Sequence, residues 1–290
     1  LMRAFFGVTL SPGTVVSMTK RCAEMVGPAL PSIRESVIRS PVAHFDESGV
    51  RTGGTLEWIH NSSTDSFTYL TLSPKRGIIG IEENGVLPQF SGIAVHDCWS
   101  PYFRYEDVKH SVCCAHILRE LKGIELNEPD RRWPGMFEYL LLSMKSAKED
   151  AQARGENHLT DRDWDYYDWF YELALKVADM ECPPPPEPTI KRRGRKNKGH
   201  ERSLIERLGS LKDQLFLFAK DFQVPFDNNQ AERDIRVAKI KTNVSGCFRS
   251  IEGAQCYLDI TSYLSTARKH GIGMFEALTS AFNGKTDFIL

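Results

Sequence analysis

The sequence lacks any apolar run of the roughly 18–20 residues that a membrane-spanning helix needs. It also lacks an excess of either charge, since 37 Lys and Arg residues stand against 38 Asp and Glu residues, a formal net charge of −1. Leu1–Leu10 is a short apolar stretch without a cleavage pattern, so we expect no secretory signal. We therefore expect a cytoplasmic protein with no membrane partner.

Paired cysteines are missing as well. The seven cysteines are scattered without a Cys-x-x-Cys pair, which favours reduced intracellular thiols over a disulfide framework. Cys113, Cys114 and His116 lack the two ligand pairs of a zinc site, so we expect buried strand cysteines there. With 41% hydrophobic and 26% charged residues, the composition excludes a disordered chain. The 290 residues suffice for one or two domains, and the start at Leu1 instead of Met suggests a fragment or an excised domain.

Hydrophobic periodicity divides the chain into three stretches. Residues 1–40 have helical spacing, and the next stretch has the short alternating runs of β-strands. We expect strands at residues 42–45, 56–60, 67–72, 93–96 and 112–115. Turns are predicted at residues 46–49 and 61–63, and short helices near residues 75–82 and 116–122.

A helical block follows, over residues 127–220. It contains a Pro-rich break at residues 182–188 and one predicted helix with an apolar face across residues 204–218. An aromatic set in this block is expected to form helical core, not a base-stacking platform: Trp164, Tyr167, Trp169 and Phe170. Two closing helices are predicted from about residue 227 to 238 and from 253 to 270.

This order of elements predicts an α/β fold. Three antiparallel strands followed by two parallel strands, flanked by helices, are typical of a ribonuclease-H-like mixed sheet. We expect a helical N-terminal segment at 1–40, a catalytic core at 41–126 and 221–290, and a helical insertion at 127–220. The insertion carries the Pro-rich and basic linker.

Two acidic residues follow predicted strands that would be neighbours in such a sheet. Asp46 ends the first strand and Asp97 ends the fourth, so parallel pairing would bring both carboxylates to one end of the sheet. Glu232 lies on the helix that follows residue 227. Three carboxylates in one cleft repel each other, and they either raise their pKa values or bind a divalent cation such as Mg²⁺.

Each of these residues also has an ordinary structural explanation. Residues 46–49 combine Asp, Ser and Gly, which are turn residues. His96 and Asp97 form a polar pair that could simply end a strand in solvent. Residues 229–232 fit a capping box, in which the Glu232 carboxylate bonds back to the helix start. Spacing alone leaves both interpretations open.

Several motifs, in order along the chain, resemble the IS66 insertion-sequence transposase family. They are residues 44–51 (HFDESGVR), 95–102 (VHDCWSPY), 114–120 (CAHILRE), 225–236 (PFDNNQAERDIR), 248–254 (FRSIEGA) and 262–271 (SYLSTARKHG). The similarity extends from about residue 10 to 280. Ser48 stands where the family motif usually has Thr and keeps the hydroxyl group. Residues 242–245 replace part of an aromatic-rich segment of the family.

The resemblance implies a ribonuclease-H-like catalytic domain in which Asp46, Asp97 and Glu232 are the three acidic metal ligands. It implies Mg²⁺ or Mn²⁺ as cofactor, with two ions that activate a nucleophile and stabilise the leaving oxygen. The implied partners are double-stranded DNA (element ends and target), a second copy of the chain and accessory proteins of the element, with the nucleoid as location. Family members also carry an N-terminal DNA-binding portion, which we expect to lie outside this sequence.

Basic residues cluster around the third acidic residue and in the linker. Those expected to contact DNA phosphates are Arg233, Arg236, Lys239, Lys241 and Arg249, together with Lys191, Arg192, Arg193, Arg195 and Lys196 in a basic arm. The alternatives are a solvated helix face and a solvated linker. His116 and Arg119 are further candidates for DNA contact, although His116 could also start a helix without any chemistry.

The sequence therefore predicts a transposase that cleaves the ends of an element and transfers the strands to target DNA. A ribonuclease-H-like nuclease without strand transfer would use the same three acids. A DNA-binding or assembly protein that kept only the fold is the third hypothesis, and it would not respond to Mg²⁺ or Mn²⁺.

Overall fold

A computed structural model describes residues 2–185 and 199–286 of the chain. It has two compact units, one made of Leu1–Lys109 and Asn228–Leu290 and the other of His110–Asp227. The predicted domain boundaries place residues 110–126 with the catalytic core, whereas the compact units place them with the inserted helices. Among the described residues, no helix is long and apolar enough to cross a membrane.

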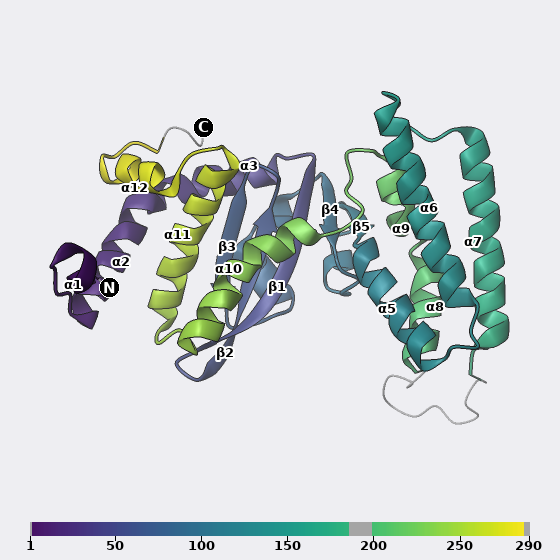
Figure 1. Cartoon of the computed structure of the whole chain (residues 1–290), viewed down its shortest axis with the longest axis horizontal. Helices are drawn as coiled ribbons and strands as arrows, with labels where there is room; N and C mark the ends of the chain where they lie inside the picture. The colour runs from purple at the N-terminus through teal and green to yellow at the C-terminus, as the bar shows by residue number, and fades with distance from the viewer. Residues whose placement is uncertain (1, 186–198, 287–290) are drawn as a thin grey trace. The chain divides into compact units, whose positions relative to one another are not determined.

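The first unit is built on a mixed β-sheet (Figure 1). Its strands and the helices between them are β1 (Val42–Thr52), β2 (Thr55–Ser63), β3 (Thr68–Ser73), α4 (Ile78–Asn84), η2 (Leu87–Gln89), β4 (Ile93–His96) and η3 (Tyr102–Arg104). The other helices are α1 (Met2–Phe6), α2 (Pro12–Val26), η1 (Gly27–Ala29), α3 (Leu30–Ile38), α10 (Asn229–Ser245), α11 (Ile251–Lys269) and α12 (Met274–Phe282).

The sheet has the strand order β3-β2-β1-β4-β5, with β5 (Lys109–Val112) at the unit boundary. β1 and β2 are antiparallel, as are β2 and β3, whereas β1 and β4 are parallel. The ribonuclease-H-like mixed sheet predicted from the element order is therefore confirmed.

Both predicted turns within the first hairpin are wrong. Residues 46–49 and 61–63 lie inside β1 and β2, because the antiparallel ladder is continuous from the pair His44–Ser63 to the pair Thr52–Thr55. The chain reverses at Gly53 and Gly54 instead, whose φ angles of 58° and 91° favour glycine. Asp46 therefore lies within a strand and not at its end.

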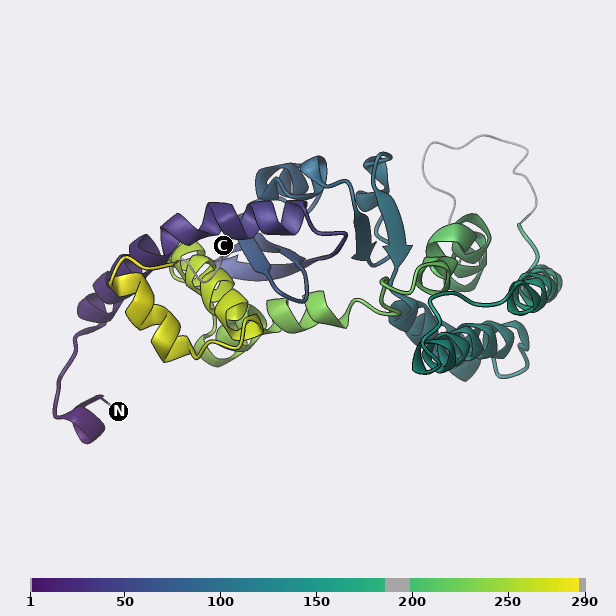
Figure 2. The ribbon, with the colours of Figure 1, turned by 90° about the horizontal axis from the view of Figure 1, so that it is seen from above.

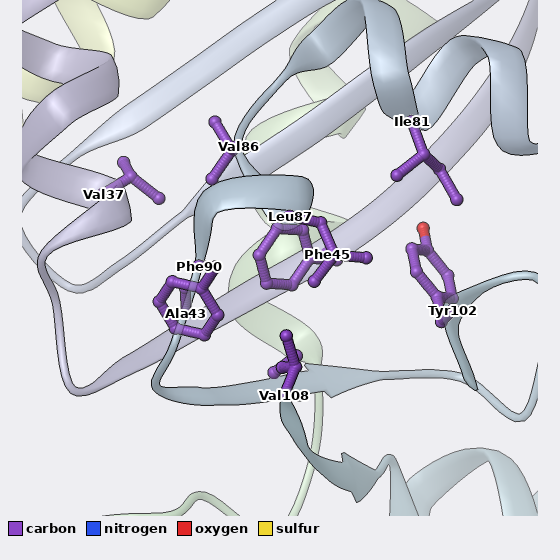
Figure 3. Packing of buried hydrophobic residues seen from close by; sticks show 10 residues of the cluster. Val37, Ala43, Phe45, Ile81, Val86, Leu87, Phe90, Tyr102 and Val108 are labelled. Carbon is purple, nitrogen blue, oxygen red and sulfur yellow. The ribbon is translucent and has the colours of Figure 1, made fainter. Parts of the chain in front are cut away.

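Two layers of helices cover the sheet on opposite faces (Figure 2). On one face, Val50, Ile59 and Leu70 pack against Ile235 and Ala238 of α10 and against α11. The opposite face is covered by α4, η2 and the end of α3, and Figure 3 shows this packing. That cluster contains Val37, Ala43, Phe45, Ile81, Val86, Leu87, Phe90, Ala94, Tyr102 and Val108.

The edge strand β3 is closed by side chains of α11. The backbone N–H groups of Thr68, Leu70 and Leu72 donate to Thr266 Oγ1, Ser262 Oγ and Gln255 Oε1, at 3.1, 3.0 and 3.2 Å. These acceptors lie four and seven residues apart on one side of α11, which matches the alternate free N–H groups of an edge strand. The helix thereby satisfies backbone groups that would otherwise be open for pairing.

The second unit is helical. Its helices are α5 (Cys114–Asn127), α6 (Trp133–Ala153), α7 (Asp161–Glu181), α8 (His200–Ser210) and α9 (Lys212–Lys220). In its core, the Tyr171 ring packs edge to face with the rings of Phe137 and Phe216. Lys148 is buried there and donates to the carbonyl oxygens of Phe218 and Val224, at 2.9 and 2.7 Å.

Three expectations for this unit are corrected. The strand predicted at 112–115 ends at Val112, and Cys114 already belongs to α5, since a short buried apolar run does not distinguish a strand from a helix start. The helix expected across 204–218 is interrupted at Leu211. Trp169 is 58% exposed, because the inner face of α7 is formed by residues such as Tyr167 and Tyr171.

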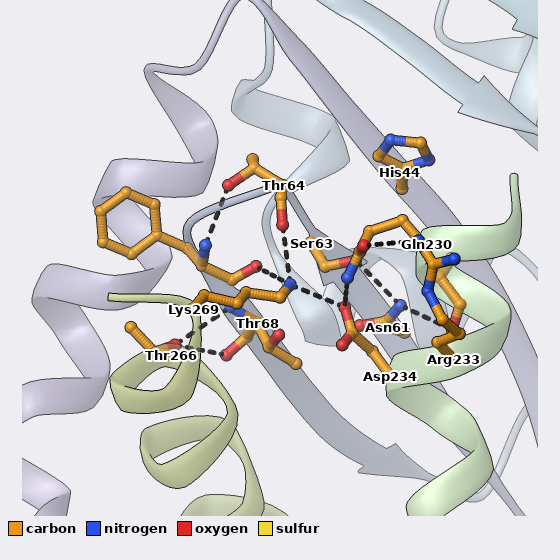
Figure 4. Close-up of polar contacts among 12 residues, drawn as sticks. His44, Asn61, Ser63, Thr64, Thr68, Gln230, Arg233, Asp234, Thr266 and Lys269 are labelled. Carbon is orange, nitrogen blue, oxygen red and sulfur yellow. Dashed lines mark hydrogen bonds and ion pairs between the residues drawn. The ribbon is translucent and has the colours of Figure 1, made fainter. Parts of the chain in front are cut away.

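A buried ion pair joins α10 to α11 (Figure 4). Lys269 Nζ lies 2.8 Å from Asp234 Oδ2, and the two side chains are only 9% and 1% exposed. The same ammonium group donates to the carbonyl oxygens of Thr64 and Phe67, at 2.7 and 2.9 Å. Gln230 of α10 also donates to Asp234. These contacts fix both the position and the rotation of α10 relative to the turn between β2 and β3.

Replacing Lys269 with Met should therefore destabilise the protein strongly, because the Asp234 carboxylate would remain buried without its cation. We expect a loss of about 3–5 kcal/mol in the free energy of unfolding, measured by urea denaturation. Lys20→Met, which removes an exposed ion pair with Glu252, serves as control and should have little effect. An equal loss in both variants would contradict the role assigned to Lys269.

Candidate active site

Asp46 and Asp97 are brought together by the parallel pairing of β1 and β4. Val42 lies opposite Ile93 and His44 opposite Val95, so the same register continued by two residues places Asp46 opposite Asp97. β4 ends at His96, and Asp97 follows at its carboxyl end. The negative charge of Asp97 contributes to raising the pKa of Asp46, as expected for two carboxylates that lie near one another.

Strand alternation determines the face on which Asp46 lies. Phe45 belongs to the cluster on the α4 face, and Val50 to the cluster on the α10 face. Because successive side chains alternate, Asp46 shares the α10 face with Val50. Its cross-strand partner Asn61 confirms this assignment, since the Asn61 amide donates to the Ala231 carbonyl of α10 at 3.3 Å.

The environment of the Asp46 carboxyl group disfavours its ionised form. Burial raises its pKa from 3.8 to about 7, and the negative charges of Glu47 and Asp97 contribute in the same direction. A hydrogen bond from the Glu47 N–H and the positive charge of Lys239 oppose this rise in pKa without cancelling it. Asp97 accepts a hydrogen bond from the Trp99 N–H at 2.9 Å. Two acidic groups are thus packed together with too little positive charge around them.

The first turn of α10, which carries Glu232, is attached directly to β1. Asn228 is 2% exposed, and its amide nitrogen donates to the Phe45 carbonyl at 2.8 Å. Its amide oxygen lies 2.8 Å from His44 Nδ1, so it accepts the proton carried by that nitrogen. Burial lowers the pKa of His44, which favours the neutral ring. Asn228 therefore does not cap the helix with its side chain but anchors it beside Asp46.

The other end of α10 is anchored as well. The backbone N–H of Phe248 donates to the Arg51 carbonyl at 3.0 Å, and the Phe248 carbonyl accepts from the Gly53 N–H at 2.8 Å. α10 thus runs along β1 in the same direction, and four residues of helix rise about as far as two residues of strand extend. Glu232 follows Asn228 by four residues, which puts it level with Asp46–Glu47 along the strand.

The side of α10 that faces the sheet is formed by Ala231, Ile235 and Ala238, which are buried. Glu232 follows Ala231 directly and is half-buried. Within residues 2–185 and 199–286, no three His, Cys, Asp or Glu side chains are grouped closely enough to hold a metal ion. The structure pairs Asp46 with Asp97 and places Glu232 on the neighbouring helix without completing a ligand set.

A divalent cation fits the part of the site that is formed. The donors are carboxylate oxygens, which Mg²⁺ and Mn²⁺ prefer. A bound cation would offset the burial and the neighbouring negative charges that raise the pKa of Asp46.

The predicted DNA contacts have different environments. Arg233, Arg236, Lys239 and Arg249 are exposed. Lys241 instead lies over the Phe248 ring, 4.3 Å from its centroid, which occupies it in a cation–π contact. The basic arm, Lys191 to Lys196, lies outside the described residues. His116 and Arg119 are on α5 in the second unit, where Arg119 donates to the Ala115 carbonyl.

Sequence reasoning missed a second polar network next to Asp46. Glu47 has a side chain that is 2% exposed, and it is bonded to Arg76 and Tyr102. Sequence reasoning also missed the anchoring roles of Asn228 and His44. Local sequence gives little signal for such contacts, since the partners lie 29 to 184 residues apart.

Comparison with known proteins agrees with the motifs. A model of the Transposase IS66 family matches residues 1–256. No curated protein matches the chain.

The pKa of Asp46 predicts how the metal-free protein responds to pH. Because the folded state holds this proton more tightly than the unfolded state, the group stabilises the fold below about pH 4, and this contribution is lost as pH rises through about 7. Asp46→Asn cannot ionise. With chelator present, we expect its free energy of unfolding to exceed that of the parent by about 2 kcal/mol at pH 5 and by about 4 kcal/mol at pH 8.

Urea denaturation of both proteins at the two pH values measures this difference. Asp107→Asn, at an exposed position, is the control and should follow the parent at both values. A pH-independent gap between parent and Asp46→Asn would refute the raised pKa.

Proposed function

The chain belongs to the Transposase IS66 family, and from this premise we propose that it is the catalytic domain of a DNA transposase. It cleaves the ends of a mobile element and joins them to target DNA. The observation that carries this proposal is the register of the parallel strands β1 and β4, which directs Asp46 and Asp97 toward one another beside the helix that bears Glu232.

In this proposal the three acids bind the cofactor. Asp46 and Asp97 would hold Mg²⁺ or Mn²⁺ between them, and Glu232 would complete the site for a second ion once DNA is bound. The ions, when bound, supply Lewis-acid polarisation and a nucleophile at neutral pH. Binding would also offset the burial and the repulsion that raise the pKa of Asp46. The anchors of α10 on β1, through Asn228 and His44, would hold the helix in place for Glu232 to take part.

The chemistry consists of two displacements at phosphorus. In the first, water attacks the phosphodiester at the element end, the P–O3′ bond breaks, and a free 3′-hydroxyl remains on the element. In the second, that hydroxyl attacks a target phosphate, forms a new P–O bond and releases a target 3′-hydroxyl. Neither step requires a covalent bond between protein and DNA.

Positively charged side chains of α10 would hold the DNA backbone. Arg233 and Arg236 are exposed and lie three residues apart, so they present two guanidinium groups on one side of the helix. Arg249 follows the end of α10 and is also exposed. Such contacts fix the position of the duplex but do not read its sequence.

Asp97→Asn should abolish both cleavage and strand transfer while leaving the fold intact, and Glu232→Gln should do the same. The measurement uses a labelled element end with Mg²⁺ or Mn²⁺, and separates cleaved from joined products on a denaturing gel. Asp107→Asn should retain activity. Circular dichroism verifies folding, and Mn²⁺ titration should show binding that Asp97→Asn weakens.

The outcomes of this assay separate the competing functions. Full activity of Asp97→Asn would refute the proposal. Cleaved but never joined ends would indicate a nuclease without strand transfer. A protein that binds DNA but shows no response to either cation would be a non-catalytic member of the family.

Arg236→Ala should weaken DNA binding about equally for all sequences. The dependence of log K on log salt should also become shallower by about 0.9, as expected for the loss of one phosphate contact. Fluorescence anisotropy over a salt series measures both effects. Lys241→Ala is the comparison, since this side chain is stacked on Phe248, and it should change the salt slope less.

A further inference from the structure

Glu47 is a buried carboxylate whose two oxygen atoms are both engaged. Arg76 donates to Oε1 through Nε at 2.9 Å and through Nη2 at 2.7 Å. The Tyr102 hydroxyl donates to Oε2 at 2.5 Å. A carboxylate this deeply buried is costly to desolvate, and hydrogen bonds to both oxygens offset that cost. Glu47 follows Asp46 by one residue in the strand, so its side chain lies on the opposite face of the sheet.

Both partners of Glu47 contact aromatic residues near Asp97 in the chain: Arg76 contacts Trp99, two residues after it, and Tyr102 contacts His96, directly before it. Arg76 stacks on the Trp99 ring, with its guanidinium carbon 4.3 Å from the centroid. The Trp99 backbone N–H in turn donates to the Asp97 carboxylate at 2.9 Å. On the other side, the Tyr102 ring stacks on His96, with centroids 4.6 Å apart, and His96 immediately precedes Asp97.

We propose that Glu47 is a positioning residue that holds the Asp97 carboxylate in place through Arg76–Trp99 and Tyr102–His96. It is not itself a metal ligand, because its oxygens are already bonded on the far face of the sheet. The inference deepens the proposed function and rests on it for the consequence in metal binding. The physical reason is that Asp97 lies beyond the last residue of β4, where the strand ladder no longer fixes the backbone.

Tyr102→Phe separates a positioning role from a ligand role. This variant removes one hydroxyl and keeps the ring that stacks on His96. If Glu47 positions Asp97, Mn²⁺ affinity measured by calorimetry should fall about tenfold, the size of effect typical for groups that orient metal ligands. If Glu47 were a ligand, freeing its Oε2 would leave the affinity unchanged or increase it, and the proposal would be overturned.

Two further variants define the measurement. Tyr263→Phe removes another buried tyrosine hydroxyl, which donates to the Ala277 carbonyl at 3.0 Å, and should change Mn²⁺ affinity less than about twofold. Glu47→Gln can still accept from Tyr102, but its NH₂ group would then face Arg76. It should also weaken binding about tenfold, and the double variant with Tyr102→Phe should fall short of the sum of both effects.

A second readout needs no metal. Hydrogen exchange at the Trp99 amide reports directly on its bond to Asp97, and we expect the exchange rate to rise about tenfold in Tyr102→Phe and Glu47→Gln but not in Tyr263→Phe. Unchanged exchange at Trp99 would overturn the positioning role whatever the metal data show. The proposed function fails if the parent does not bind Mn²⁺, or if Asp46→Asn binds it equally well. The exchange data would still decide the role of Glu47 in that case.

Discussion

The parallel pairing of β1 with β4 is the constraint on which the site depends. It is a short contact, from Val42–Ile93 to His44–Val95, and its register, continued by two residues, sets Asp97 opposite Asp46. A shift of β4 by one residue would turn Asp97 to the other face of the sheet. The core on the α4 face opposes such a shift, because Ala94 packs in the cluster with Phe45.

The adjacent acids Asp46 and Glu47 illustrate how a strand assigns two functions to one pair of carboxylates. Asp46 faces α10, and burial together with the charges of Glu47 and Asp97 raises its pKa to about 7. Burial also raises the pKa of Glu47, but the hydrogen bonds from Tyr102 and Arg76 oppose that rise. The first environment leaves a carboxylate available for a cation, and the second uses up a carboxylate in internal bonds.

Much of the fold could be predicted from the sequence, and less of the site. The strand at residues 93–96 and the acid after it were predictable, because an apolar run that ends in a polar residue is a local signal. The turn expected at 46–49 failed because these residues pair with residues 58–61 of β2, and such cross-strand pairing overrides local preference. Contacts such as Asn228 with His44 span 184 residues, so no local pattern announces them.

The chain connection at the start of α10 has a structural consequence. The inserted helical unit ends at Asp227, and the next residue, Asn228, is already bonded to His44 and to the backbone of Phe45. At this one of its two chain connections, the insertion therefore joins directly to a residue that is hydrogen-bonded to the strand segment before Asp46. The side chain that begins α10 after the insertion is thus the same one that fixes this helix beside the strand of Asp46.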